Sequence, residues 1–321
     1  MPAPLARSAR VRQLLLAALL LAAPAAPAAP AARAQRVTLV AEGPAGPIDL
    51  GLATLPARVG MGNRALRDAL RWEDGAAGIR VARLDLRAGA FGIAVQAIVV
   101  RADPARLRFA LQRGVADNGM TGTWTIDSLP RRAVLGMNAG QFKETGPWGW
   151  LVVRGEELRN PLRAPLAIGI RIDTTGRLRW VPPAHEAEWR HDPGTAYAFQ
   201  SFPYLYFDRQ LSPVLRDGGT TDLGHRDARL VLAEADDGAT LFVLTRYAGL
   251  GTLTERVPIG LTTPECVALL AALGARHAVM LDGGVSAQLL LRDGAGAGVE
   301  RRWAGLRRVP LALVAEPRPE H

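Results

Sequence analysis

Short apolar runs separated by glycine, proline and aspartate dominate the chain, and this pattern is typical of strands rather than long helices. The runs of strand type before residue 131 cover residues 37–41, 79–86, 92–100 and 107–112. Those after it cover residues 150–153, 229–233, 240–246, 278–281 and 309–314. Helical spacing is confined to residues 60–72 and 262–273, and the proline-rich stretch 182–195 is predicted to be a loop. We therefore predict a single α+β domain with a mixed or largely antiparallel sheet and a few covering helices.

The clearest helical pattern begins at Thr262 and ends before Gly274. A threonine ahead of the first turn, Pro264 within it and Glu265 near the positive end of the helix mark the start. The glycine marks the end. The apolar residues at helical spacing are Cys266, Leu269, Leu270 and Leu273. We expect this face to be buried, so that the only cysteine of the chain is a core residue.

The first 34 residues have the composition of a secretory signal peptide. Three arginines lie among the first twelve residues, the apolar run 14–23 follows, and an Ala-Arg-Ala site occupies residues 32–34. We predict cleavage before Gln35 and export to the periplasm or the cell exterior, with an uncleaved anchor as the alternative. No later segment has the ~18 uninterrupted apolar residues of a membrane span, so none is expected after cleavage.

Arginine dominates the charge of the chain without forming a nucleic-acid footprint. The formal net charge is +9, and residues 1–34 hold four arginines and no acid, which leaves 9 − 4 = +5. Lys143 is the only lysine. The arginines are scattered and few aromatics lie between them, so we expect no nucleic-acid partner. A lone cysteine excludes an intramolecular disulfide, and the core alone must hold the fold.

The stretch 281–286, with the sequence Leu-Asp-Gly-Gly-Val-Ser, is the strongest candidate for chemistry. Glycines at a strand end allow backbone N–H groups to approach a ligand, while Asp282 and Ser286 offer a carboxylate and a hydroxyl. A tight hairpin turn is the alternative, since Asp-Gly is a favoured turn pair. The five histidines lack the spacing of metal ligands, and we predict no metal cofactor. A calcium ion held by Asp282 and loop carbonyls remains an alternative.

A second strand end of similar design lies at residues 134–142, where an apolar run ends at Asn138 and Gly140. We expect it to meet the 281–286 stretch at one edge of a sheet and to complete a site for a polar substrate. Capping of a turn by the Asn138 side chain is the alternative.

Five motifs occur in order along the second half of the chain. They are Asn-x-Gly-x-Phe at 138–142, Pro-x-Gly at 147–149 before a strand, Arg229 before a hairpin, Gly-Leu-Thr at 260–262 before a helix, and Leu-Asp-Gly-Gly-x-Ser at 281–286. Together they resemble the phosphodiester glycosidase family over residues 133–314. Ala139, Gln141 and Val285 stand where many members have glycine, phenylalanine and glycine, which bears on the substrate more than on the reaction.

After the predicted signal peptide (1–34), the resemblance implies a strand-rich N-terminal part (35–130) and a catalytic core (131–316). It implies an exported hydrolase that cleaves the glycosidic C1–O bond of a sugar-1-phosphodiester, giving free sugar and a phosphomonoester. The substrate would be a glycosyl phosphodiester or a polysaccharide of surface glycan or exopolysaccharide metabolism. A non-catalytic glycan-binding or polysaccharide-assembly protein on the same fold is the main alternative, and a phosphodiesterase that breaks P–O is a third.

The resemblance also implies roles for single residues. Asp282 is expected to be the general base or the carboxylate that orients the sugar, and Arg229 to clamp the phosphate with its planar guanidinium. Asn138 would complete the catalytic set by holding sugar hydroxyls. The expected substrate-binding residues are Gly140, Gln141, Phe142, Gln200, Arg226, Gly283, Gly284 and Ser286. Each has a structural alternative in packing, in backbone capping or in a solvated surface.

Overall fold

The computed structural model describes residues 36–76, 78–115, 122–163, 167–216, 222–249, 257–293 and 299–319. Contacts within the chain divide it after Gln35, and the fold described below is that of the second unit, residues 36–321. The expected signal peptide lies outside the described residues, so its cleavage and the export of the chain stay predictions. No helix in the described part of the chain is long and apolar enough to cross a membrane.

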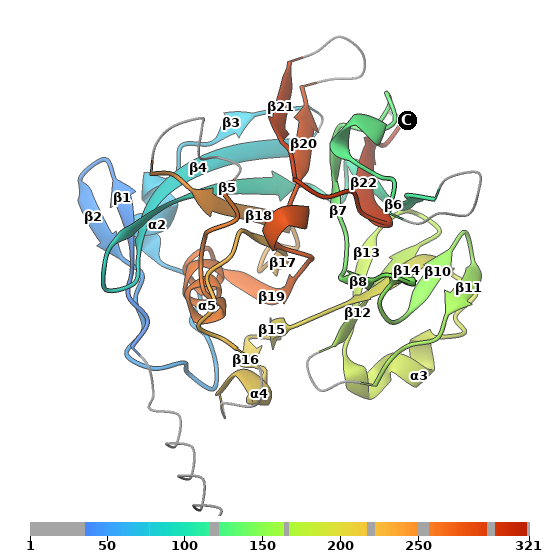
Figure 1. Cartoon of the computed structure of the whole chain (residues 1–321), viewed down its shortest axis with the longest axis horizontal. Coiled ribbons are helices and arrows are strands. Elements are labelled where there is room, and N and C mark those ends of the chain that lie inside the picture. The colour runs from blue at the N-terminus through green and yellow to red at the C-terminus, as the bar shows by residue number, and fades with distance from the viewer. Residues whose placement is uncertain are drawn as a thin grey trace, which may run out of the picture. The chain divides into compact units, whose positions relative to one another are not determined.

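A ten-stranded sheet forms the largest layer (Figure 1). Its strands lie in the order β16 (Gln210–Leu211), β15 (Tyr204–Phe207), β19 (Ala275–Met280), β17 (Arg229–Ala235), β18 (Thr240–Tyr247), β5 (Ile93–Ala102), β4 (Ile79–Ala88), β1 (Leu39–Gly43) and β2 (Gly46–Asp49), with β3 (Glu73–Asp74) beside β4. Neighbouring strands of this sheet pair antiparallel. The sequence prediction of a largely antiparallel sheet is therefore confirmed.

Two further sheets have five strands each and are also antiparallel. The first contains β11 (Glu156–Arg159), β10 (Leu151–Val153), β14 (Thr195–Ser201), β12 (Ile168–Asp173) and β13 (Leu178–Val181) in that order. The second contains β21 (Glu300–Trp303), β20 (Leu289–Arg292), β7 (Leu135–Asn138), β22 (Leu311–Pro317) and β6 (Leu107–Arg113). A short hairpin of β8 (Phe142–Lys143) and β9 (Gly146–Pro147) leads from β7 into the first of them.

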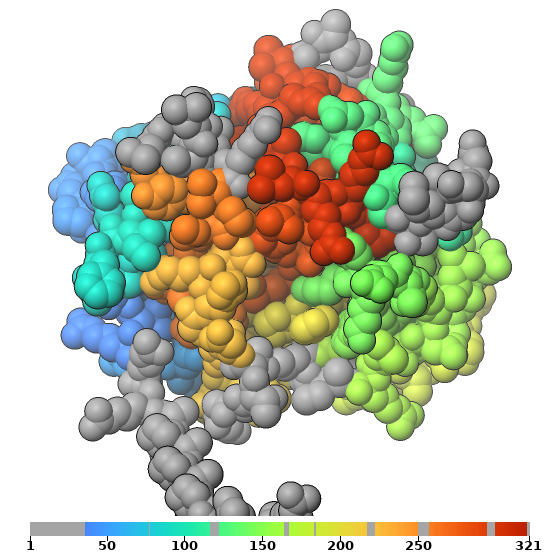
Figure 2. Space-filling view, in the orientation of Figure 1, coloured from blue at the N-terminus to red at the C-terminus, as the bar shows by residue number. Residues whose placement is uncertain are grey.

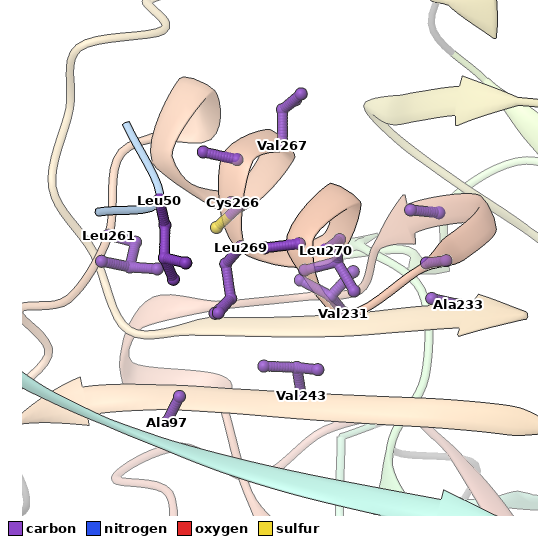
Figure 3. Close-up of a cluster of buried hydrophobic side chains, with 14 of the residues drawn as sticks. Leu50, Ala97, Val231, Ala233, Val243, Leu261, Cys266, Val267, Leu269 and Leu270 are labelled. Atoms are coloured by element: carbon purple, nitrogen blue, oxygen red, sulfur yellow. The ribbon is translucent and has the colours of Figure 1, made fainter. Parts of the chain in front are cut away.

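Both faces of the ten-stranded sheet are buried at its central strands, as the alternation along β17 shows. Val231 and Ala233 point into the core that contains helix α5 (Thr263–Ala272), whereas Leu230 and Leu232 point into the core shared with the five-stranded sheets. Figure 3 shows α5 lying over the strands that carry Val231 and Val243, with Leu269 between helix and sheet. A strand buried on both faces reads as a nearly continuous apolar run, which explains why β17 and β18 were predictable from the sequence.

Helix α5 follows the prediction closely. The Thr262 hydroxyl accepts a hydrogen bond from the Glu265 N–H at 3.3 Å, and the Glu265 carboxylate accepts one from the Thr262 N–H at 2.9 Å, a reciprocal capping box. Burial extends beyond the predicted stripe to almost the whole helix. Burial also raises the pKa of the Cys266 thiol to about 12, so this cysteine is an unreactive core residue, as expected.

One local prediction is confirmed and one is wrong. The helical spacing at 60–72 yields only the six-residue α2 (Arg64–Ala69), which Asn63 caps and which buries a single leucine. The stretch 182–195, predicted to be a loop, contains η2 (Pro183–His185) and α3 (Glu186–Trp189). Other short helices within the described residues are α4 (Pro213–Arg216), η1 (Ile126–Ser128) and η4 (Gly284–Ser286). The protein is thus richer in strands than the predicted α+β class suggests, because most of its layers are sheets.

Candidate functional site

The candidate site forms around the loop that leaves β19 and enters β20 through η4. Two hydrogen bonds continue the β17–β19 pairing beyond the strands: Leu281 N–H donates to the Leu230 carbonyl at 2.8 Å, and Gly284 N–H to the Ala228 carbonyl at 2.7 Å. The loop therefore lies against residues 227–230. Because β19 and β20 belong to different sheets, the loop also crosses from one layer to another.

Asn138, the last residue of β7, joins the two strand ends that the sequence singled out. Its side-chain amide donates to the Asp282 carbonyl at 2.6 Å and accepts from the Gln288 N–H at 2.9 Å. The two strand ends do lie side by side, as expected. They do not share one sheet edge, however, because β7 and β19 belong to different sheets. Asn138 is only 1% exposed, so its amide holds the loop and is turned away from solvent.

The Asp282 carboxyl is an unusual group in this loop. Its Oδ2 atom is buried and has no hydrogen-bond partner among the described residues. The pKa of Asp282 is raised to about 6, chiefly by burial and to a smaller extent by the charge of the nearby Asp227 carboxylate. A hydrogen bond with the Ser286 side chain and the charge of Arg307 oppose the rise in pKa. Asp282 is therefore poised to exchange a proton near neutral pH.

Asp227 is a second carboxylate of the site, and motif analysis did not identify it. It lies just before β17, where it forms an isolated bridge with Leu261. Burial raises the pKa of Asp227, while the charges of Arg229 and His225 lower it. The His225 Nε2 atom is 4.0 Å from its Oδ2. An acid two residues before a strand arginine is the only local signal for it, and that signal is weak.

The glycines of the two motifs are required because other atoms of the protein lie too close for a Cβ. A Cβ on Gly283 would lie 2.6 Å from the Ala228 carbonyl oxygen, and one on Gly284 would lie 2.7 Å from the Asp227 carboxylate. Gly284 also has a φ of +59°, which favours glycine. A Cβ on Gly140 would overlap the Gln200 carbonyl oxygen. Close packing of the loops around Asp282 thus depends on all three.

We expect Gly140→Ala to lower the free energy of unfolding by about 2 kcal/mol, because the new methyl group meets a backbone carbonyl that cannot rotate away. Gly60→Ala is the matched control, since a Cβ at Gly60 has no neighbour within 4 Å. Urea unfolding of both variants measures the difference. Equal stability of the two would show that the loop relaxes freely around position 140.

Two of the predicted arginines are already engaged by the protein. Arg229 donates from Nε to the Leu261 carbonyl at 2.9 Å and from Nη2 to the His225 carbonyl at 2.5 Å, which holds its guanidinium beside Asp227. Arg226 forms a bidentate pair with Glu265, with N–O distances of 2.6 and 2.7 Å. Arg226 is thus tied to the first turn of α5.

The two predicted glutamines serve the backbone. The Gln141 amide oxygen accepts from the Ser201 hydroxyl and from the Phe202 N–H, both at 3.0 Å, and its nitrogen donates to the Phe202 carbonyl. The Gln200 amide oxygen accepts from the N–H groups of Trp150 at 2.9 Å and Leu162 at 2.8 Å. Both side chains therefore fasten neighbouring loops together.

Phe142 begins the β8–β9 hairpin and faces a cation. The Arg307 guanidinium lies 4.6 Å from the centroid of the Phe142 ring, a cation–π distance. Beside this contact is a hollow of about 290 Å³, lined in part by Lys143, Arg307 and Arg308. A larger hollow of about 790 Å³ lies around Glu234 at the other end of β17, roughly 17 Å from Arg229 by strand length. The smaller hollow is the one beside the Asp282 loop.

No metal-binding group of three or more histidine, cysteine, aspartate or glutamate side chains occurs within the part of the chain that the structure describes.

Comparison with known proteins places the chain in a family. The NAGPA model, described as phosphodiester glycosidase, matches residues 131–316, more than half of the chain. The chain belongs to the phosphodiester glycosidase family. A comparison with curated proteins gives no match.

Solved structures with the same fold include a zebrafish enzyme of this family. The catalytic domain of zebrafish N-acetylglucosamine-1-phosphodiester alpha-N-acetylglucosaminidase, auto-inhibited by its pro-peptide, matches with a TM-score of 0.54 and 13% identity, over 82% of this chain and 96% of that one. A Burkholderia pseudomallei protein proposed to be exported matches with a TM-score of 0.53 and 14% identity, over 82% and 99%. A hypothetical protein from Synechocystis matches with a TM-score of 0.50 and 14% identity, over 88% and 68%. At these identities the likeness concerns the fold.

Proposed function

We propose that this chain is an exported hydrolase that cleaves the glycosidic C1–O bond of a sugar-1-phosphodiester. The observation that carries the proposal is the buried Asp282 carboxyl, with its pKa raised to about 6, next to a second carboxylate, Asp227. Membership of the phosphodiester glycosidase family supplies the reaction class. The substrate would belong to surface glycan or exopolysaccharide metabolism.

The chemistry of the leaving group explains why the site can differ from that of ordinary glycosidases. A phosphomonoester has a second pKa of ~6, so it leaves as a stable anion without a proton from a general acid. Asp282, ionised at neutral pH, takes a proton from water as the water oxygen bonds to C1. The C1–O bond electrons pass to the phosphate, and Asp227 stabilises positive charge that develops on the sugar ring. We assign Arg229 to the scissile phosphate.

The other predicted residues act by positioning. Asn138, Gln141 and Gln200 hold the loops that frame the carboxylates, and Ser286 supplies a hydrogen bond to Asp282. Arg226 stabilises the start of α5 through Glu265. Phe142 fixes the direction of the Arg307 side chain. Most of these side chains thus hold the loops of the site through contacts within the protein.

Hydrolysis in ¹⁸O-labelled water tests the reaction. A panel of alkyl and nucleotidyl sugar-1-phosphodiesters is incubated with the protein, and the products are analysed by mass spectrometry. Cleavage of C1–O places ¹⁸O in the sugar, as expected. Label in the phosphate would identify a phosphodiesterase, and binding of the same glycans without turnover by folded protein would identify a binding protein.

We expect kcat/KM to rise with pH through about pH 6 and to level off above it. Asp282 must be ionised to accept a proton from water, and burial holds its pKa near 6. A phosphodiester substrate does not titrate in this range, so the profile reports the free enzyme. A profile that falls between pH 5 and 7 would instead make Asp282 a general acid.

A further inference from the structure

Three cations surround the hollow next to the Asp282 loop. Lys143 comes from the β8–β9 hairpin, and Arg307 and Arg308 come from the segment that leads into β22. Glu144 is the only acid among the lining residues that the structure describes, so positive charge predominates among them. Figure 2 shows the C-terminal part of the chain, in red, meeting the green segment that follows β7 on one face of the molecule.

These three cations lack the acidic partners that other basic residues have. Arg190, Arg226 and Arg292 each pair with a glutamate at 2.6 to 2.8 Å. Among the described residues, by contrast, Lys143, Arg307 and Arg308 form no ion pair. Like charges gathered on one wall repel one another, and an anion placed between them removes that repulsion.

Arg307 connects this hollow to the reacting group. Its N–H donates to the Val285 carbonyl at 3.1 Å, and its carbonyl accepts from the Gln288 side chain at 3.2 Å. The Phe142 ring then fixes the guanidinium. Its charge acts on the Asp282 carboxyl. The hollow is therefore connected through Arg307 to the loop that carries Asp282.

We propose that Lys143, Arg307 and Arg308 form a subsite for a second anionic group, carried by the aglycone. The anionic group is a further phosphate, as in a nucleoside diphosphate sugar, or a carboxylate, as in a uronate-bearing glycan. Guanidinium and ammonium groups bind both by charge-assisted hydrogen bonds. The assignment of the bound anion to a substrate aglycone rests on the proposed function, whereas the presence of an anion site does not. The protein thus selects aglycones that carry more than the scissile phosphate.

The test compares three matched sugar-1-phosphodiesters, with an uncharged alkyl aglycone, a second phosphate or a carboxylate. The variant is Lys143→Gln combined with Arg308→Gln, both at exposed positions beside the site. The control is Arg106→Gln combined with Arg177→Gln, which removes the same charge from the larger hollow. We expect kcat/KM for the anionic aglycones to fall about tenfold in the variant only, with the uncharged substrate unaffected.

The anionic aglycone with the higher kcat/KM, phosphate or carboxylate, identifies the chemical group that the subsite binds. Equal losses for all three substrates, or equal losses in variant and control, would overturn the proposal. If no phosphodiester is hydrolysed at all, calorimetric titration with inorganic pyrophosphate tests the anion site independently of the reaction. Pyrophosphate binding that is lost in the variant and kept in the control would support the subsite. Identical isotherms for the parent, the variant and the control would refute it.

Discussion

Asp282→Asn is expected to lower kcat/KM for a sugar-1-phosphodiester by about 10³-fold, the typical contribution of a positioned general base. Asparagine has the same shape as aspartate but cannot take the proton from water. Its backbone still accepts the hydrogen bond from Asn138, so the loop keeps its path. Steady-state kinetics of the purified variant measures the loss. Asp68→Asn, on the exposed face of α2, is the control and should retain full activity.

The same variant is expected to be more stable than the parent at pH 8. The folded-state pKa of Asp282 is raised from 3.8 to about 6. A raised pKa favours the folded state while the group is protonated, and that contribution is lost as pH rises through 6. Above pH 6 the parent must bury an ionised carboxylate, whereas the amide carries no charge. We expect a gain on the order of 1 kcal/mol at pH 8 that disappears below pH 4.

Together the two readouts separate a catalytic role from a structural one. Loss of activity with unchanged or higher thermal stability assigns Asp282 to the reaction. Loss of both would mean that the carboxylate holds the loop. Asp227→Asn provides the internal comparison, and a larger loss of kcat/KM in that variant than in Asp282→Asn would exchange the roles of the two carboxylates.

The sequence predicted the elements whose burial or end residues can be recognised from neighbouring residues in the chain. Strands β17 and β18 lie inside the large sheet with both faces covered, and α5 carries its start and stop residues in its own sequence. Strand β12 was not predicted, because Gly169 and Arg171 interrupt its apolar pattern. Arg171 is 5% exposed and pairs with Asp192 at 2.7 Å, a partner that no local pattern indicates.

The site shows the same division. Asp282 and Asn138 were identifiable because each is a polar residue at the end of an apolar run, and such residues lie where a strand ends. Asp227 and Arg307 were not, because one is placed by the pairing of β17 with β19 and the other by the return of the chain after β21. The ion pair between Arg226 and Glu265 was likewise not predictable, because the two residues are far apart in the sequence and meet only in the folded protein. Motifs therefore located the loop that carries the candidate carboxylate, but the residues that contact it or shift its pKa came only from the structure.

Asn138→Ala is expected to lower the free energy of unfolding by about 3 kcal/mol and to reduce kcat with it. The substitution leaves the buried Asp282 carbonyl and Gln288 N–H without partners, and each unpaired buried group costs about 1–3 kcal/mol. With the tether gone, the Asp282 carboxylate moves relative to bound substrate, and a positioning error of this kind lowers kcat more than it raises KM. Denaturant unfolding and steady-state kinetics give the two values.

Asn63→Ala is the matched control for the same amide deletion. Asn63 caps α2 through one hydrogen bond to the Leu66 N–H at 3.1 Å, so its loss should cost only about 1 kcal/mol and leave kcat unchanged. If Asn138 instead holds sugar hydroxyls, Asn138→Ala would raise KM strongly while stability changed little. Because the Asn138 side chain is 1% exposed and both ends of its amide are bonded within the protein, we expect the opposite pattern.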